Sequence, residues 1–278
     1  MRLWYDFWDM MPFEMLHWEF MQNALLAVVL MAPLFGLLST MIVTGRMSFF
    51  SDALGHSAFT GIAIGCIFGA AMPTWVAVIF SVVFALLFSF VRSRSNQAAD
   101  TLIGVFSSGA VALGIFIATL GGGSFTKYNT YLIGDILSVT PGKIALLGAV
   151  LVAVIAFWIF FGNKLILSSV HPQLASSRGI ATKAVQTLFT VAIAVVVTLA
   201  INWVGLLILN SLLVLPGAAA RNVSKNLRQY HFLCVVFALI ASVAGLCISY
   251  YLGASAGAAI SLMLVGIFAL SFCFRKAG

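Results

Sequence analysis

Charged residues are scarce in this chain. Of its 278 residues, 8% are Asp, Glu, Lys or Arg, whereas 63% are hydrophobic. A soluble domain of this length cannot bury so much apolar surface, but the hydrocarbon of a bilayer can cover it. The composition therefore excludes an ordinary soluble domain and predicts an all-α membrane protein that crosses the bilayer many times.

Several enzyme and redox signatures are also missing. The four cysteines lie in apolar runs without a C-x-x-C pair, so we expect them to be packing residues. No G-x-x-x-x-G-K-[ST] loop occurs, so any energy from nucleotides must come from another chain. H-E-x-x-H and G-x-S-x-G are absent too. The net charge of +7 is spread between apolar runs, which is typical of membrane topology signals and not of a nucleic-acid partner.

Apolar segments long enough to span a bilayer recur along the sequence. About 20 residues at 1.5 Å each cross a hydrocarbon core of about 30 Å. Residues 184–220 would form one helix of roughly 55 Å, so we place a turn at Asn202-Trp203. We expect about nine transmembrane helices, with eight as the alternative count, at about residues 24–43, 53–71, 74–91, 101–120, 144–162, 184–201, 203–220, 231–252 and 256–274.

The basic residues predict the orientation of these spans. With nine spans, one set of alternate loops and ends holds eleven Lys and Arg residues, and the other set holds three. Because cytoplasmic loops carry the excess of positive charge, we expect the N-terminus outside and the C-terminus in the cytoplasm. We divide the chain into an N-terminal interfacial segment, residues 1–20, and a single transmembrane domain, residues 21–278.

Ionisable residues inside the apolar spans are the candidates for function. Asp52 and His56 stand four residues apart at the start of the second span, so on a helix they share one face about 40° apart. A carboxylate and an imidazole suit zinc, manganese or ferrous iron, and two ligands alone suit passage better than storage. The alternative is an Asp–His hydrogen bond that holds a helix start, with Asp52 as the cap.

Glycines occupy a different face of the same span. Gly61, Gly65 and Gly69 form two overlapping G-x-x-x-G repeats. At about 100° per residue they lie about 180° to 260° away from Asp52. We therefore expect the glycine face to pack closely on a neighbouring helix while Asp52 and His56 face an interior.

Two loops are longer than a simple turn requires. Residues 124–142 include an apolar stretch around Asp135, which favours a segment that re-enters the protein-lined interior. On the opposite side, Pro172 and Gly179 predict the start and the end of a short helix along the membrane surface. A short cytoplasmic helix between two spans is the shape expected of a docking element.

Two acids in membrane segments also raise the alternative of an intramembrane aspartyl protease. Such proteases carry a Tyr-Asp and a Gly-x-Gly-Asp. Here Asp52 follows Ser51, and Asp135 is preceded by Leu132-Ile133-Gly134, so both signatures fail.

Four stretches of the chain resemble the permease subunits of the bacterial zinc, manganese and iron ABC importers. Residues 46–57 (RMSFFSDALGHS) are similar to that family's R-M-[SA]-x-x-[GS]-D-[AT]-L-x-H-[AS] segment. Residues 100–104 resemble its D-x-x-[IL]-G start of a span, residues 131–137 its Y-L-F-G-[DS]-[IL]-L stretch, and residues 210–221 its S-L-L-[IV]-[IL]-P-A-A-x-A-R end of a late span. The resemblance covers about residues 20–275.

The resemblance implies a homodimeric pore, surrounded by the lipid of the bacterial cytoplasmic membrane. One ABC ATPase would dock under each permease, and an extracytoplasmic metal-binding protein would deliver the ion. The chain would be no enzyme and hold no cofactor of its own, with ATP on the partner subunit. Asp52, His56 and Asp135 would contact the metal. The helix that couples to the ATPase would include Pro172, Gln173, Ala175, Arg178 and Gly179.

One departure from the family pattern and two rival functions leave alternatives open. The family's coupling segment commonly carries an acid near the position of Gln173, and this chain has none there, so we do not expect a charge-based pairing with the ATPase at that position. The rival functions are a permease for a metal chelate, such as a siderophore or cobalamin, and a secondary transporter. A chelate pathway would be wide and would not need an Asp–His pair.

Overall fold

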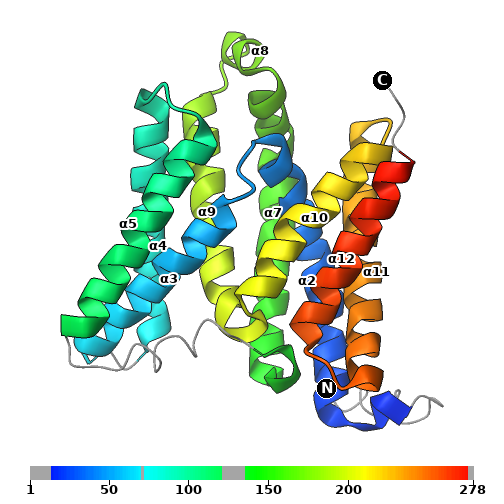
Figure 1. Ribbon diagram of the computed structural model, residues 1–278. Helices are drawn as coiled ribbons and strands as arrows, with labels where there is room; N and C mark the ends of the chain where they lie inside the picture. Colours follow the sequence, from blue (N-terminus) through cyan, green and yellow to red (C-terminus); the bar gives the residue numbers. More distant parts are fainter. Residues whose placement is uncertain (1–13, 70–71, 121–134, 275–278) are drawn as a thin grey trace. The chain divides into compact units, whose positions relative to one another are not determined.

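The computed structural model describes residues 14–69, 72–120 and 135–274, without the side chain of Asn202. In these ranges nine helices have 18 or more residues (Figure 1). They are α2 Glu19–Thr44, α3 Phe50–Ile67, α4 Pro73–Arg94, α5 Ala99–Leu120, α7 Pro141–Val170, α9 Thr182–Val204, α10 Leu206–Val223, α11 Leu227–Leu252 and α12 Ala256–Cys273. Three short helices accompany them: η1 Glu14–His17, η2 Ile136–Ser138 and α8 Pro172–Ser177. Each predicted span lies mostly within a different long helix, which confirms the all-α class.

Eight of the nine long helices are long and apolar enough to cross a membrane. The exception is α3, because Asp52, His56 and its small polar residues lower its hydropathy. Its 18 residues still make a helix of about 27 Å, close to the thickness of the hydrocarbon core. The nine long helices match the expected count of nine, and the run 184–220 forms two of them, α9 and α10.

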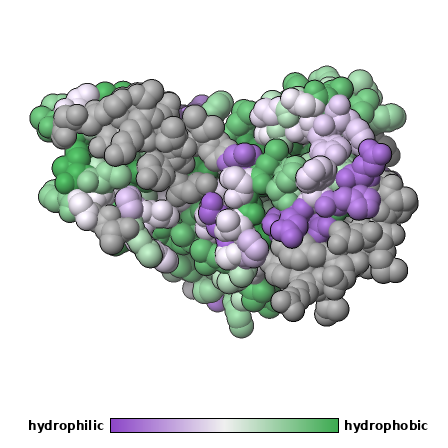
Figure 2. Space-filling view, turned by 90° about the horizontal axis from the view of Figure 1, so that it is seen from below, coloured by the Kyte–Doolittle hydropathy of each residue, from purple (hydrophilic) through white to green (hydrophobic). Residues whose placement is uncertain are grey.

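Large apolar side chains on the helix surfaces fit a lipid environment. Ile79 of α4 is 65% exposed, and Ile159 and Phe160 of α7 are 73% and 74% exposed. In the view of Figure 2, hydrophobic residues reach the outer edge of the molecule. In water this surface would be unfavourable, whereas acyl chains cover it without cost.

The chain changes helix at Gly205, three residues after the start of the predicted turn at Asn202-Trp203. The first helix, α9, continues through both of those residues and ends at Val204. Gly205 has a φ of 86° and a ψ of 154°, a conformation that residues with a Cβ rarely adopt. The predicted position was wrong because Gly205, and not Asn202 or Trp203, can adopt the backbone conformation that ends α9.

The structure divides into two compact units, each built from separate parts of the chain. The first comprises Met1–Thr40, Asp135–Ala156 and Trp203–Gly278. The second comprises Met41–Gly134 and Phe157–Asn202. Of the predicted interfacial segment, residues 1–13 lie outside the described residues, and the division into residues 1–20 and 21–278 stays a prediction.

In the first unit, α10, α11 and α12 pack on one another. Gly245 of α11 lets the backbone of α12 approach, because a Cβ there would lie 2.6 Å from the Cα of Ile260. Pro216 lies inside α10, and the amide of the next residue, Gly217, donates to the hydroxyl of Ser39 in α2 at 2.9 Å. A hydroxyl from a neighbouring helix thus binds the backbone beside the proline.

In the second unit, α3 packs against α4 and α5. A Cβ on Gly61 would lie 2.5 Å from the Cα of Ala77, and one on Gly65 would lie 3.1 Å from the Cα of Pro73. Gly69 differs from its predicted packing role. It follows the last turn of α3 with a φ of 65°, and no atom outside its own chain neighbours lies within 4 Å of a Cβ built there. Its backbone conformation ends the helix instead.

We expect Gly61→Ala to destabilise the protein, because the added methyl group meets the backbone of α4 and the helices must separate. Overpacking of this kind costs about 1–3 kcal/mol. The matched control is Gly109→Ala in α5, where a Cβ meets no atom within 4 Å. Thermal unfolding of the full chain in detergent should give a lower Tm for Gly61→Ala alone. Equal Tm values for the two variants would contradict this packing.

Candidate functional site

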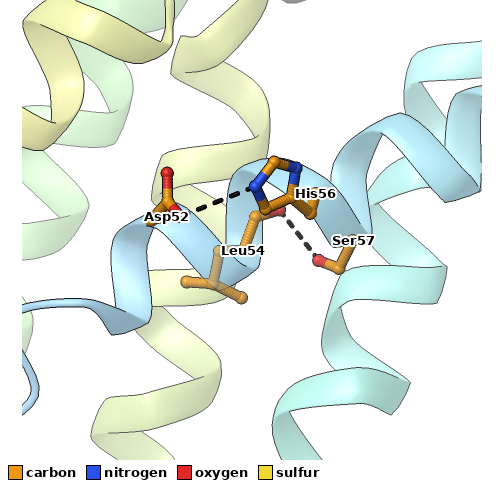
Figure 3. A network of polar contacts seen from close by, with 4 residues as sticks. All are labelled: Asp52, Leu54, His56 and Ser57. Carbon is orange, nitrogen blue, oxygen red and sulfur yellow. Dashed lines mark hydrogen bonds and ion pairs between the residues drawn. The ribbon is translucent and has the colours of Figure 1, made fainter. Parts of the chain in front are cut away.

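Asp52 and His56 lie side by side on one face of α3. The Nε2 atom of His56 lies 3.5 Å from the Oδ2 atom of Asp52. Figure 3 shows the carboxylate and the imidazole on the same side of the helix, one turn apart. The side chains are 32% exposed for His56 and 44% exposed for Asp52. The pair is therefore accessible, so an ion could reach both groups from the same side.

The start of α3 does not use Asp52 as the N-cap residue. Phe49 occupies that position with a φ of −87° and a ψ of 0°, and Asp52 is the third residue of the helix. A carboxylate in the first turn is favoured by the helix dipole. Asp52 therefore can stabilise the first turn of α3 through its charge, but it is not the residue that caps the helix.

Hydroxyl groups link α3 to its neighbouring helices. Ser57 Oγ donates to the carbonyl of Leu54 at 2.9 Å, as Figure 3 shows. The same hydroxyl lies 3.0 Å from that of Ser81 in α4. Thr60 Oγ1 lies 2.7 Å from the carbonyl oxygen of Ala110 in α5. These bonds tie α3 to α4 and α5 in the turns that include and follow His56.

An arginine from α4 holds the turn that precedes α3. Arg46 has a φ of 53°, a left-handed conformation that is uncommon outside glycine. The guanidinium of Arg92 donates to Met47 Sδ at 2.9 Å and to the carbonyl of Gly45 at 3.3 Å. Sequence reasoning counted Arg92 only as a topology charge. Nothing in one sequence links a residue at the end of α4 to a turn 45 positions earlier.

Asp135 lies in the first unit and caps a short helix. Its Oδ1 accepts a hydrogen bond from the amide of Leu137 at 3.0 Å, and its carbonyl accepts from the hydroxyl of Ser138 at 2.8 Å. The residue is exposed, and η2 follows it directly. Of the predicted re-entrant stretch, residues 124–134 lie outside the described residues.

The short helix that Pro172 and Gly179 predict is present as α8. Pro172 is its first residue, and Gly179 follows it with a φ of 75°. Ala175 is fully buried and anchors the helix, whereas Gln173 and Arg178 are exposed. The helix therefore offers an outer surface of polar residues and Leu174, which is 45% exposed, supported on one buried methyl group.

In the part of the chain that the structure describes, no three His, Cys, Asp or Glu side chains gather as a metal site. Asp52 and His56 supply one oxygen and one nitrogen ligand. A resident metal ion is usually held by three or four protein ligands. The pair thus fits brief contact with an ion that draws its other ligands from water or a second protein group.

Comparison with protein families identifies the chain. The model of the ABC 3 transport family matches residues 17–275. The chain belongs to this family. The matched region includes all nine long helices and the short helix α8.

Relatives of this family member match over nearly their whole length. The high-affinity zinc uptake system membrane protein ZnuB of Haemophilus influenzae is 26% identical over 93% of this chain and 98% of its own. The manganese transport system membrane protein MntC of Halalkalibacterium halodurans is 28% identical over 94% and 89%. The structure of PsaBC from Streptococcus pneumoniae in complex with Fab aligns with a TM-score of 0.78, at 28% identity over 92% of both chains.

Proposed function

We propose that this chain is the permease subunit of an ATP-binding-cassette importer that moves a divalent transition metal ion into the cytoplasm. The family match over residues 17–275 is the observation that carries the proposal. Relatives named for zinc and for manganese transport support an importer of the free ion over a permease for a metal chelate. We infer that zinc, manganese or ferrous iron is the cargo.

We infer the partners from the family to which the chain belongs and from the absence of a nucleotide-binding loop. The chain lacks such a loop, so ATP hydrolysis belongs to a partner ATPase and the chain itself performs no catalysis. An extracytoplasmic metal-binding protein delivers the ion, and two copies of this chain form the pore in the bacterial cytoplasmic membrane. The excess of basic residues on alternate loops supports an outside N-terminus and a cytoplasmic C-terminus.

In this orientation Asp52 and His56 lie near the cytoplasmic end of the pathway, since α3 begins beside Arg46 on the basic side. Oxygen and imidazole ligands bind the proposed cargo ions. Two ligands bind weakly, so the ion can leave for the cytoplasm. We assign the pair to inner passage or release, and not to first capture.

The helix α8 lies on the same cytoplasmic side and is suited to couple the ATPase to the pore. Its outer residues are exposed, including Leu174 at 45%. Without an acid near Gln173, docking relies on shape and apolar contact more than on charge. Movement of α8 then passes to α7 and α9, which it directly connects.

Asp52→Asn and His56→Ala should each reduce metal uptake by roughly tenfold or more, the scale seen when groups that support a metal site are removed. The assay is accumulation of radioactive zinc, manganese and iron, measured in parallel, in cells that express the variants at the wild-type level. The control is His17→Ala, which removes an exposed histidine from the other unit. Wild-type uptake by both pair variants would overturn the ligand assignment.

Asp135 allows a separate test of charge against capping. We propose that its charge contributes to the pathway, so Asp135→Asn and Asp135→Ala should both reduce uptake. The asparagine keeps an oxygen that can accept from the Leu137 amide, whereas alanine removes it. Normal uptake in Asp135→Asn with a loss in Asp135→Ala would assign the residue to capping alone.

Leu174→Glu should reduce the amount of ATPase that co-purifies with the permease, because it places a charge in the proposed apolar contact. The matched control is Leu227→Glu at the start of α11, another leucine that is 45% exposed on the same predicted side. The measurement is the ATPase-to-permease ratio after affinity purification. Equal ratios for the two variants would exclude α8 as a specific docking element.

A further inference from the structure

A groove in the second unit runs between α4 and α9, and its volume is about 570 Å³. From α4 it is lined by Val83, Leu86, Leu87 and Phe90, and from α9 by Lys183 and Thr187. Val83, Leu87 and Phe90 are each more than half exposed. The walls of the groove are therefore mostly apolar side chains that no described part of the chain covers.

The polar groups at the base of the groove bind one another. Thr187 Oγ1 donates to the carbonyl of Lys183 at 2.9 Å. The hydroxyl oxygen of Ser89 lies 2.5 Å from Thr187 Oγ1. The two hydroxyls of Ser89 and Thr187 therefore share one hydrogen bond. This pairing links α4 to α9 and leaves the base satisfied, so an apolar chain can lie over it without breaking a hydrogen bond.

One end of the groove is basic. Lys183 is exposed and lines it, and α9 begins at the residue before it. Arg94 is the last residue of α4, and its guanidinium carbon lies 4.5 Å from the centre of the Phe90 ring. The nearby Arg92 is engaged with the turn before α3. No Asp or Glu is among the described residues that line the groove.

We propose that this groove binds one anionic phospholipid. An acyl chain lies along the apolar stripe from Val83 to Phe90, about 10 Å in length, and the phosphate contacts Lys183 and Arg94. A basic pocket between transmembrane helices is a recognised setting for anionic headgroups. Both cations also belong to the side that the charge distribution assigns to the cytoplasm, where anionic lipid attracts basic residues.

The test is native mass spectrometry of the full chain in detergent with either phosphatidylglycerol or phosphatidylcholine added at equal concentration. The wild type should retain one phosphatidylglycerol molecule in preference to phosphatidylcholine. Lys183→Gln and Arg94→Gln should each weaken that binding about fivefold, the effect of removing one cation near an anionic headgroup. Both residues are exposed, so the variants should keep the wild-type Tm.

Two further variants separate this site from general lipid contact. Lys164→Gln is the matched control, because Lys164 is also exposed and its ammonium lies 5.6 Å from the centre of the Phe161 ring, outside the groove. It should bind phosphatidylglycerol as the wild type does. Leu87→Trp fills the groove without changing a charge and should abolish the retained lipid.

Three results would overturn the proposal. Equal retention of the two lipids would show ordinary contact with the surrounding bilayer. Equal binding by Lys183→Gln, Arg94→Gln and Lys164→Gln would remove the assigned phosphate contacts. A loss of dimer mass in Leu87→Trp, with phosphatidylglycerol still retained, would show that a second copy of this chain occupies the groove.

Discussion

The close approach of α3 to α4 at Gly61 and Gly65 is the contact on which the candidate site depends. It needs positions without a Cβ, because any larger residue meets the backbone of α4. Together with the hydroxyl bonds of Ser57 and Thr60, it fixes how α3 is rotated. Asp52 and His56 lie together on this helix and remain partly accessible.

This arrangement reconciles two opposing demands on α3. A transport pathway needs polar ligands at membrane depth, whereas lipid penalises exposed ionisable groups. Packing against α4 and α5 on two sides keeps much of this less apolar helix away from lipid, while apolar helices such as α4 and α7 carry the exposed hydrophobic surface. Thus α3, the one long helix that is not apolar enough to count as a membrane span by composition, carries Asp52 and His56.

A side chain from another helix stabilises the irregular turn before α3. The turn between α2 and α3 contains a left-handed Arg46, and Arg92 binds the residues on either side of it. Two residues along α4, Arg94 stacks on Phe90 at the groove with α9. Arg92 and Arg94, at the same end of α4, therefore contact different parts of the unit. Their shared role as topology signals does not predict this difference.

Much of the architecture could be predicted from the residues alone. The apolar runs, each close to the length needed to cross a bilayer, locate all nine long helices, and Pro172 with Gly179 locates α8, because helix length and helix termini depend on nearby residues. The i, i+4 spacing likewise places Asp52 and His56 on one face, since helical geometry is local.

Other features were decided only by tertiary structure. Gly61 and Gly65 meet the backbone of α4, whereas Gly69, which continues the same repeat in sequence, meets no atom within 4 Å. The bonds of Arg92 to Gly45 and Met47, and of Ser89 to Thr187, join residues far apart in the chain. A single sequence carries no record of such pairs, because which distant side chains meet is set by how whole helices pack.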